Sequence, residues 1–282
     1  MTIALPTCEA VDLRGMPQIV DGRMQWASPL PKDGAGVLIL DEISSAAPDV
    51  QVAAHHIAWH EDGSDVALPK SWHLVMTGNR ASHKTLYRPM SGPLRNRVIL
   101  LDIESDADSW CHWAVRNAIS PLITGFIRWL PDALSTAEIP DEGAFPSPRA
   151  WARASAALGF SVSPAIETEL LRGIVGQAMA VKLAAYLTMA RTLPDIEAIM
   201  REPGKAKVPK EPSLCYAVTC SLAQYTCLRQ QSAMAYIQRL PAEYGVLYIR
   251  DIRDRYDIKV DSDIRAWIGK HINLFEDDAD VR

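Results

Sequence analysis

The stretch GVLILDEISSA, residues 36–46, decides how the first part of this chain folds. Four successive aliphatic residues lead directly into Asp41 and Glu42. A continuous apolar run of this kind is typical of a strand that is covered on both faces of a parallel sheet. Burying an ionised carboxylate without a partner is strongly unfavourable, so a pair at the end of such a strand commonly holds a cation or polarises a water molecule. We therefore interpret this stretch as a buried strand that ends in a reactive acidic pair.

Two further apolar runs in the first third of the chain are predicted to be strands of the same sheet. They are LVMTG at 74–78 and VILLDI at 98–103, and both are nearly continuous rather than alternating. Between the first two predicted strands lies a predicted helix, which begins near Pro48 because proline suits the first helical turn. Upstream, Asp21-Gly22 separates two short strand-like runs and predicts a β-hairpin. The strand, helix, strand order predicts an α/β fold with a parallel sheet.

From about residue 105 onward, the apolar residues recur at spacings of three and four, which predicts helices almost throughout. The stretch EPGKAKVPKEP at 202–212 has the composition of an exposed linker between two helical blocks. We therefore predict an α/β part over 1–104, a helical part over 105–200 and a C-terminal helical extension over 201–282.

Composition narrows the possible partners. The chain has 282 residues, a formal charge of -5 and no cluster of Lys or Arg, so nucleic acid and anionic membranes are not expected partners. The five cysteines form no CxxC motif, and their odd number is typical of reduced thiols in a cytoplasmic protein. No signal peptide or membrane-spanning stretch is visible. A cytoplasmic protein that binds other proteins or small molecules is the expected class.

Polar side chains stand next to each predicted strand, in the places where parallel sheets bind ligands. Asn79 follows the second strand, and adjacent strand ends would bring it beside Glu42. Arg95 and Arg97 precede the third strand, and Arg149 begins a helix in the sequence PSPRAW. Arginine suits a developing phosphate charge because its planar guanidinium stays protonated and can bind two oxygens at once. In nucleotide hydrolases of this layout, the first acid holds Mg²⁺ and the second orients the attacking water.

The ordered set of these motifs resembles the AAA+ ATPases of the MoxR-like group, in the versions found in bacteriophages and bacteria. The motifs are strand-LDE, helix, LP..W, strand-TGNR, PLRNR-strand and PSPRAW, together with DLRGMP and its following hairpin. The resemblance implies a partial AAA+ parallel-sheet core, a helical lid over 105–200 and a helical extension. It also implies Asp41 and Glu42 as the Walker B acids, Asn79 as sensor 1, Arg97 as the arginine finger and Arg149 as the sensor 2 arginine.

The resemblance further implies an activity and partners. ATP would be the substrate and Mg²⁺, held by Asp41, the metal. Subunits would form a ring, a hexamer in the family, in which Arg97 reaches the γ-phosphate bound to a neighbour. Hydrolysis would move the lid and remodel a protein client, as in a chaperone. Arg95 is the less favoured finger, because the family pattern places its arginine directly after the Asn and before the strand.

One family motif, the phosphate-binding loop G-x-x-x-x-G-K-[ST], does not occur in this sequence. The only Gly-Lys pairs, at 204–205 and 269–270, are followed by Ala and His and lack the earlier glycine. We therefore expect either a truncated reading frame or a degenerate subunit, with weak nucleotide binding in both cases. The alternative to an ATPase is a non-catalytic assembly subunit that offers Arg97 in trans or docks through its helical half.

Other residue patterns favour packing over chemistry. His56 and His60 are one helical turn apart, but they lack the HExxH pattern and a third ligand, so zinc is disfavoured. Cys111 lies beside His112, but adjacent helical residues point in different directions, which favours a core cysteine over a nucleophile. Four tryptophans are expected to build the core of the helical part. They are Trp110, Trp113, Trp129 and Trp151.

Overall fold

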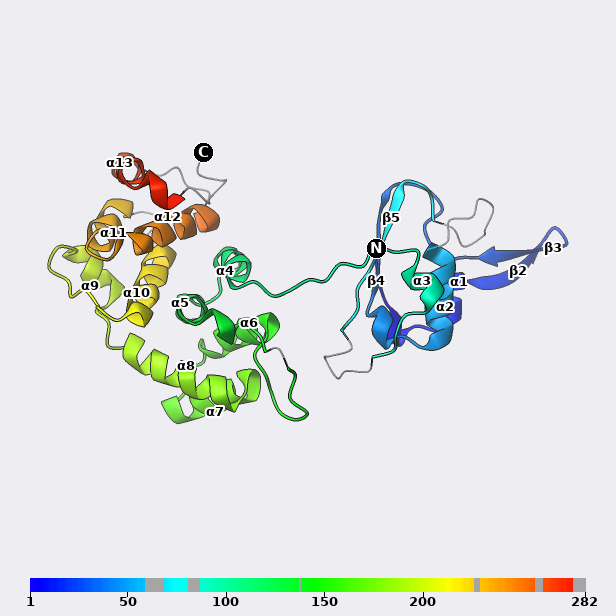
Figure 1. Ribbon diagram of the computed structural model, residues 1–282, viewed down its shortest axis with the longest axis horizontal. Coiled ribbons are helices and arrows are strands. Elements are labelled where there is room, and N and C mark those ends of the chain that lie inside the picture. Colours follow the sequence, from blue (N-terminus) through cyan, green and yellow to red (C-terminus); the bar gives the residue numbers. More distant parts are fainter. Residues whose placement is uncertain (59–67, 81–86, 137, 226–228, 257–260, 276–282) are drawn as a thin grey trace. The chain divides into compact units, whose positions relative to one another are not determined.

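The computed structural model describes residues 1–282 except 59–67, 81–86, 137, 226–228, 257–260 and 276–282. The described chain is a mixed α/β structure that divides into two compact units (Figure 1). Met1–Ile103 form the α/β unit, and Glu104–Arg282 form the helical unit. No described helix is long and apolar enough to cross a membrane.

The α/β unit contains a three-stranded parallel sheet in the order β1-β4-β5. Its strands are β1 (Thr2–Ala4), β4 (Gly36–Asp41) and β5 (Trp72–Met76). Leu38 of β4 lies opposite Leu74 of β5. The strands predicted from the first two apolar runs and their parallel relation are therefore confirmed, and β4 lies in the middle of the sheet.

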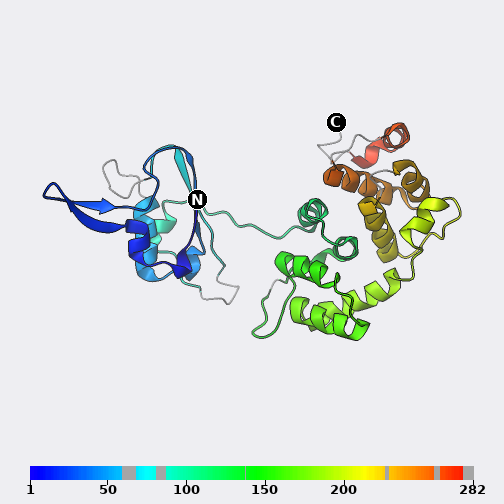
Figure 2. The ribbon, with the colours of Figure 1, turned by 180° about the vertical axis from the view of Figure 1, so that it is seen from behind.

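Among the described residues, one face of this sheet is packed by helices. The helices α1 (Ala10–Arg14), α2 (Pro48–Ala58) and α3 (Gly92–Arg95) lie together on the same side of β4 (Figures 1 and 2). Two short 3-10 turns complete the unit, η1 (Leu5–Thr7) and η2 (Ile43–Ser45). The buried hydrophobic residues of this unit are Leu5, Leu13, Leu30, Leu38, Leu40, Ile43, Ala46, Val50, Ala53, Ala54, Ile57, Leu68 and Leu94.

The opposite face of the sheet carries exposed side chains. Val37 and Val75 project from it with 43% and 45% of their surface exposed, because alternate residues of a strand point to opposite faces. The expectation that β4 is covered on both faces is therefore wrong. A continuous apolar run does not report by itself how many layers pack on a strand.

The predicted hairpin is present as β2 (Met16–Val20) and β3 (Arg23–Ala27), which pair antiparallel. Its two turn residues, Asp21 and Gly22, both have positive φ, at 50° and 74°. This is the type I′ geometry whose twist matches that of the flanking strands. The hairpin projects from the rest of the α/β unit (Figure 1).

The third predicted strand, at 98–103, is not a strand in the structure. Ile99, Leu101 and Ile103 of this segment are 88%, 79% and 87% exposed. A strand requires a hydrogen-bonded neighbour, and no described strand pairs with this segment. The partner that would make this apolar segment a strand is not among the described residues.

The helical unit consists of ten α-helices in its described part. Several of them begin with proline, as at Pro121 and Pro148, where the missing N–H has no helical partner to lose. The first five helices are α4 (Ala107–Arg116), α5 (Pro121–Trp129), α6 (Pro148–Ala157), α7 (Pro164–Val175) and α8 (Gln177–Ala190). The others are α9 (Ile196–Arg201), α10 (Pro212–Tyr225), α11 (Gln230–Ile237), α12 (Ala242–Tyr256) and α13 (Ser262–Lys270). Two 3-10 turns are η4 (Pro131–Ala133) and η5 (Ile272–Phe275).

Two hydrophobic clusters fill the helical unit, and α10 joins them. One cluster is built mainly from α4 to α8, and the other from α9 to α13. Leu214 and Ala217 of α10 belong to the first cluster, while Val218 and Leu222 of the same helix belong to the second. Gly125 lets α5 approach α10 closely, because a Cβ there would lie 3.3 Å from the backbone of Ala217. The segments before and after residue 200 therefore share one compact unit.

Replacing Gly15 with alanine is expected to destabilise the α/β unit by about 3 kcal/mol or more. Gly15 has a φ of +84°, and a Cβ there would lie 2.1 Å from the carbonyl oxygen of Ala27. Gly34→Ala is the matched control, since Gly34 has a φ of +75° but nothing within 4 Å of the added atom. It isolates the backbone cost of about 1–2 kcal/mol. Urea titrations followed by NMR methyl signals of Leu38 and Leu40 measure both, and equal losses would contradict the role of the contact with Ala27.

Candidate functional site

The acidic pair lies where β4 ends and the chain turns. Asp41 is the last residue of β4 and is half-buried, whereas Glu42 is exposed. Glu42 has left-handed backbone angles, with φ 61° and ψ 45°. A non-glycine residue in this region costs on the order of 1–3 kcal/mol, and such residues cluster at functional sites. Because Glu42 leaves the extended conformation, Asp41 and Glu42 do not follow the alternation of side chains that a continuous strand would give.

Thr77 ties both acids to the neighbouring strand. Its hydroxyl donates a hydrogen bond to Oδ1 of Asp41 and accepts one, at 3.0 Å, from the backbone N–H of Glu42. The backbone of Thr77 contributes two more bonds, donating to the carbonyl of Leu40 at 3.0 Å and accepting from the N–H of Ile43 at 2.9 Å. Thr77 therefore fixes the geometry of the acidic turn from the end of β5.

Asn79 is held against the same turn. Its backbone N–H donates to Oγ of Ser44 at 2.8 Å, and Ser44 is buried. Gly78 permits this approach, since a Cβ there would lie 3.2 Å from the same oxygen. The segment 77–79 and the acidic turn are thus bound together, and Asn79 lies at the same edge of the sheet as Asp41 and Glu42, as the parallel pairing predicts.

The two arginines before residue 98 lie at the end of α3, and both are exposed. Arg95 is the last residue of that helix. Nη1 of Arg97 donates to the carbonyl of Pro93 at 2.8 Å. Burial lowers the pKa of His55 on α2, and the positive charge of Arg97 lowers it further. Arg97 therefore stands near α2, with its guanidinium bonded to the backbone of its own turn.

Arg149 belongs to the helical unit. It is exposed in the first turn of α6, whose N-cap Ser147 accepts a hydrogen bond from the N–H of Ala150 at 3.1 Å. The structure thus brings Asp41, Glu42 and Asn79 together, whereas Arg149 lies in a separate unit. Its predicted role as a lid arginine stays a prediction.

The atoms at the acidic turn fit the ligand preferences of Mg²⁺. This ion takes oxygen ligands and is usually bound through one or two carboxylates, with waters and substrate phosphates completing the octahedron. Asp41 offers a carboxylate and Thr77 a hydroxyl, and Glu42 adds a second, exposed carboxylate. Within the described ranges there is no group of three or more His, Cys, Asp or Glu side chains that would hold a metal by protein ligands alone.

Sequence reasoning missed Thr77 and Ser44. The Thr77 hydroxyl, after β5, accepts from Glu42 after β4, and the Ser44 hydroxyl, after β4, accepts from Asn79 after β5. Thr77 could have been found from its position: it directly follows an apolar run, and the parallel pairing of the two strands places it beside the acidic pair. No pattern distinguished Ser44, because a serine after a strand is common in ordinary turns.

The alternative sites suggested by cysteines and histidines have structural explanations where they are described. Cys111 is fully buried, and burial raises its pKa to about 12, so it stays a thiol and packs in the core. His112 is bonded to Asp254 of α12 instead. His60 of the possible zinc pair lies outside the described residues. Of the four tryptophans, Trp110 and Trp151 are buried in the core, whereas Trp113 and Trp129 remain partly exposed.

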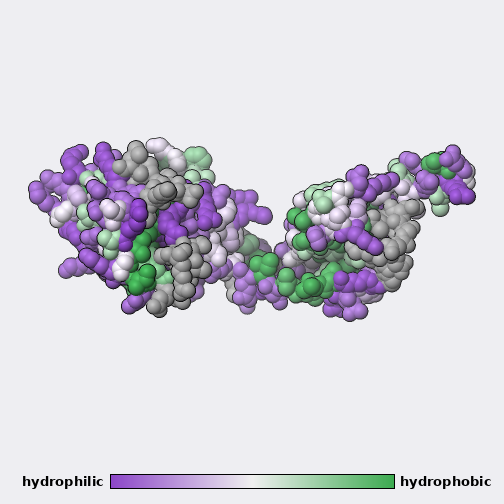
Figure 3. Space-filling view, turned by 90° about the horizontal axis from the view of Figure 1, so that it is seen from above, coloured by the Kyte–Doolittle hydropathy of each residue, from purple (hydrophilic) through white to green (hydrophobic). Residues whose placement is uncertain are grey.

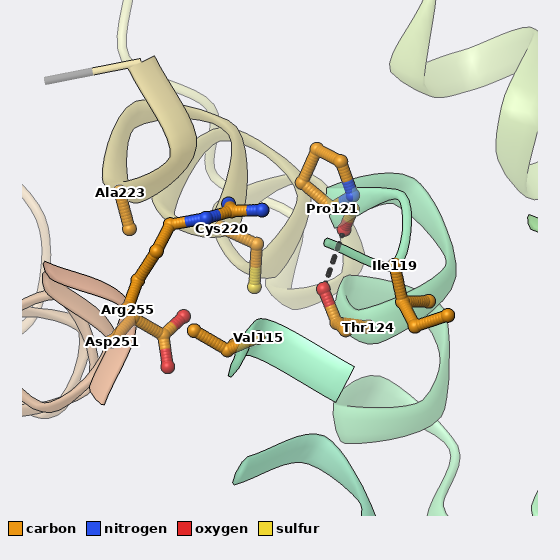
Figure 4. Close-up of a pocket in the computed structure, with 8 residues that line it drawn as sticks. All are labelled: Val115, Ile119, Pro121, Thr124, Cys220, Ala223, Asp251 and Arg255. Atoms are coloured by element: carbon orange, nitrogen blue, oxygen red, sulfur yellow. Dashed lines mark hydrogen bonds between the residues drawn. The ribbon is translucent and has the colours of Figure 1, made fainter. Parts of the chain in front are cut away.

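A small hollow in the helical unit lies where α4, α5, α10 and α12 meet (Figure 4). The hydroxyl of Thr124 donates to the carbonyl of Pro121 at 3.1 Å, so this group is already paired. The carboxylate of Asp251 binds both terminal nitrogens of Arg128 at 2.6 Å. These polar groups around the hollow are thus paired within the packed helices, and we assign no ligand to the hollow.

Comparisons with protein-family models, with curated proteins and with solved structures found no match to this chain.

Proposed function

We propose that this chain is an AAA+-type module in which the acidic turn acts on Mg²⁺-bound ATP. One observation carries the proposal: Asp41 and Glu42 end the central strand of a parallel sheet, and Thr77 and Asn79 bind to that turn from the adjacent strand. Open parallel sheets bind ligands at the carboxyl ends of their strands. The motif order of the sequence, which resembles MoxR-like ATPases, supports the same choice of substrate.

Each residue has a distinct role in this proposal. Asp41 would hold Mg²⁺, which neutralises phosphate charge, and the Thr77 hydroxyl would orient its carboxylate. Glu42 would accept a proton from the attacking water or orient it, and Asn79 would position that water or the γ-phosphate. Arg97, which is exposed at the end of α3, would stabilise the phosphate charge in a neighbouring subunit.

The sequence lacks the glycine-rich loop and lysine that cradle phosphates in this family. We therefore propose weak ATP binding by the isolated chain and slow turnover. A ring of subunits and a protein client are part of the same proposal, since Arg97 would act across a subunit boundary and the helical unit would transmit movement.

Glu42→Gln is expected to lower ATP turnover by about 100-fold or more, because a positioned general base contributes about 10²–10⁴-fold. Binding of a fluorescent ATP analogue with Mg²⁺ should stay within about threefold of wild type, since the substitution keeps the shape of the side chain. Asp21→Asn is the matched control: it removes one exposed acid of the same unit, and asparagine suits the type I′ turn at that position. Equal turnover in Glu42→Gln and Asp21→Asn would contradict the catalytic role of Glu42.

A second candidate function is a non-catalytic assembly subunit. Two observations favour it: the phosphate-binding loop motif does not occur in the sequence, and Arg97 is exposed. In that case the wild-type chain should bind no ATP analogue at millimolar concentration. It should still form oligomers in sedimentation analysis, and Arg97→Ala should leave the oligomers intact. Saturable Mg²⁺-dependent binding of the analogue would favour the hydrolytic proposal instead.

A further inference from the structure

A cleft in the helical unit, which shares no lining residue with the hollow of Figure 4, is lined by charged and aromatic side chains. Its volume is about 260 Å³, and its lining includes Asp108, Arg128, Tyr216, Glu243 and Arg250. Pockets that enclose a drug-sized ligand measure roughly 300–1,000 Å³, so this cleft suits one side chain with its adjoining backbone. Hydrophilic surface predominates on the face of the helical unit that Figure 3 shows. Polar recognition is therefore the kind that we sought in this unit.

Arg128 brings two unused hydrogen-bond donors to this cleft. Its side chain is 5% exposed, and a guanidinium carries five N–H groups. Nη1 donates to Asp251 and, at 3.2 Å, to Cys220, and Nη2 donates to Asp251. The N–H of Nε and the second N–H of Nη2 have no partner among the described residues, and they lie side by side on one edge of the planar group. Since the other edges face Asp251 and Cys220, this edge is the one left for a ligand acceptor.

The acceptor that fits the free edge of Arg128 is a neutral carbonyl oxygen. The charge of Arg128 is already balanced by Asp251. Outside that pair, the lining carries the carboxylates of Asp108 and Glu243 and the guanidinium of Arg250, which already interacts within the chain. The remaining charge is negative, so a carboxylate or phosphate would be repelled, whereas a carbonyl oxygen adds no charge. A peptide backbone supplies such an acceptor at every residue.

The same cleft offers a place for a positively charged group. Tyr216 and Tyr244 both line it, and their rings pack edge to face with centroids 5.1 Å apart. Burial raises the pKa of Tyr216, and the carboxylate of Glu243 raises it further, so the charge of Glu243 acts on this phenol. The hydroxyl of Tyr216 has no hydrogen-bond partner among the described residues. Carboxylates and aromatic faces both attract ammonium and guanidinium groups.

We propose that this cleft binds a basic residue of another polypeptide, with a backbone carbonyl on the free edge of Arg128 and the positive side chain beside Asp108 and Glu243. The Tyr216 ring adds a cation–π contact. The negative rim rejects acidic peptides, and the donor edge of Arg128 favours a peptide over a bare cation. All of these residues belong to the helical unit. The proposal is independent of ATP hydrolysis, so either can fail without the other.

The test titrates the full ¹⁵N-labelled chain with the peptide Ac-Ala-Lys-Ala-NH₂ and follows it by NMR, in which the Nε–H of an arginine is observed directly. The Nε–H signal of Arg128 and the amide signal of Tyr216 should shift saturably. Exchange of that Nε–H with solvent should slow by at least about threefold, because a carbonyl then accepts it. Peptides with norleucine or glutamate in place of lysine should bind at least about tenfold more weakly. Added salt should weaken binding of the lysine peptide.

Two substitutions locate the positive group. Glu243→Gln and Asp108→Asn should each weaken binding of the lysine peptide by about threefold to tenfold, because each removes one charge and keeps the shape of the side chain. Both residues are exposed, so both variants should keep the wild-type amide spectrum away from the cleft. Glu169→Gln is the matched control, since Glu169 is an exposed acid on α7 that does not line the cleft. It should bind the peptide as wild type does.

Four results would overturn the proposal. Equal binding of the lysine and norleucine peptides would remove the role of the two carboxylates. Binding of n-butylammonium as tight as that of the lysine peptide would make a small amine the ligand. A shift of the Arg128 Nε–H in the peptide-free protein that disappears on dilution would make a second copy of the chain the occupant. The last is an unchanged spectrum at millimolar concentrations of the lysine peptide and of its arginine counterpart.

Discussion

Arg128→Met is expected to destabilise the helical unit by about 3–5 kcal/mol. Arg128 and Asp251 form a two-pronged ion pair between α5 and α12 in which their side chains are 5% and 1% exposed. Burial lowers the pKa of Arg128, but the charge and hydrogen bonds of Asp251, together with nearby Cys220 and Cys111, raise it to well above its ordinary value, and the guanidinium stays charged. The methionine fills similar space but leaves the carboxylate of Asp251 buried without its partner. Urea unfolding followed by NMR methyl signals of Leu183 and Leu187 measures the loss.

Replacing Asp251 as well separates two effects of Arg128→Met: the loss of the ion pair and the burial of an unpaired carboxylate. Arg128→Met combined with Asp251→Leu should recover most of the stability, because replacing both members of a buried pair by apolar residues is often neutral or stabilising. Arg172→Met is the matched control: Arg172 pairs with Glu169 on the surface of α7, and such pairs contribute about 0–1 kcal/mol. If Arg128→Met alone were as stable as Arg172→Met, the buried ion pair would not be what holds α5 to α12.

Trp151→Ala is expected to cost about 3–5 kcal/mol in the same unit. Trp151 is fully buried, its ring centroid lies 5.4 Å from that of Phe126, and its indole N–H donates to the carbonyl of Ala133 at 2.8 Å. Alanine would leave a large cavity and remove the partner of that carbonyl. A fall in the urea midpoint at an unchanged slope would report the loss.

Trp113→Ala is the matched control, because it makes the same substitution at a tryptophan that is not buried. Trp113 lies on α4 with 45% of its surface exposed, so its truncation removes little buried area. We expect a loss of about 1 kcal/mol or less. If the two alanine variants lost equal stability, burial would not be what makes Trp151 important.

Local patterns in the sequence predicted several elements because their causes are local. Asp21-Gly22 predicted the hairpin, since both residues tolerate the positive φ that a type I′ turn needs. Pro48 predicted the start of α2 because its fixed φ suits a first helical turn. The runs that became β4 and β5 were recognised as strands, with boundaries shifted by one or two residues at either end.

Part of the candidate site was also predictable. Asp41, Glu42 and Asn79 follow strands whose parallel pairing could be expected, so their place at one edge followed from topology. Thr77 was not predicted, because its role depends on facing Asp41 across the two strands. The placement of Arg97 and Arg149 beside a nucleotide stays a prediction, since it requires a neighbouring subunit and the position of the lid.

The segment 98–103 shows where pattern reading fails. Its residues have the composition of a buried strand, and they are nevertheless exposed and unpaired among the described strands. The apolar composition of a segment indicates how much free energy its burial would contribute. Whether the segment pairs as a strand depends on a partner that lies elsewhere in the sequence or in another molecule.

The sequence by itself determined the local conformations: the hairpin turn, the helix starts at proline, the extended apolar runs and the acidic pair at the end of one of them. These follow from backbone sterics and periodicity within a few residues. Only the tertiary structure decided that β4 lies in the middle of the sheet, that Thr77 binds both acids, that one face of the sheet carries exposed side chains and that Arg128 meets Asp251. Such contacts join residues tens to more than a hundred positions apart, and they depend on packing geometry that no local pattern encodes.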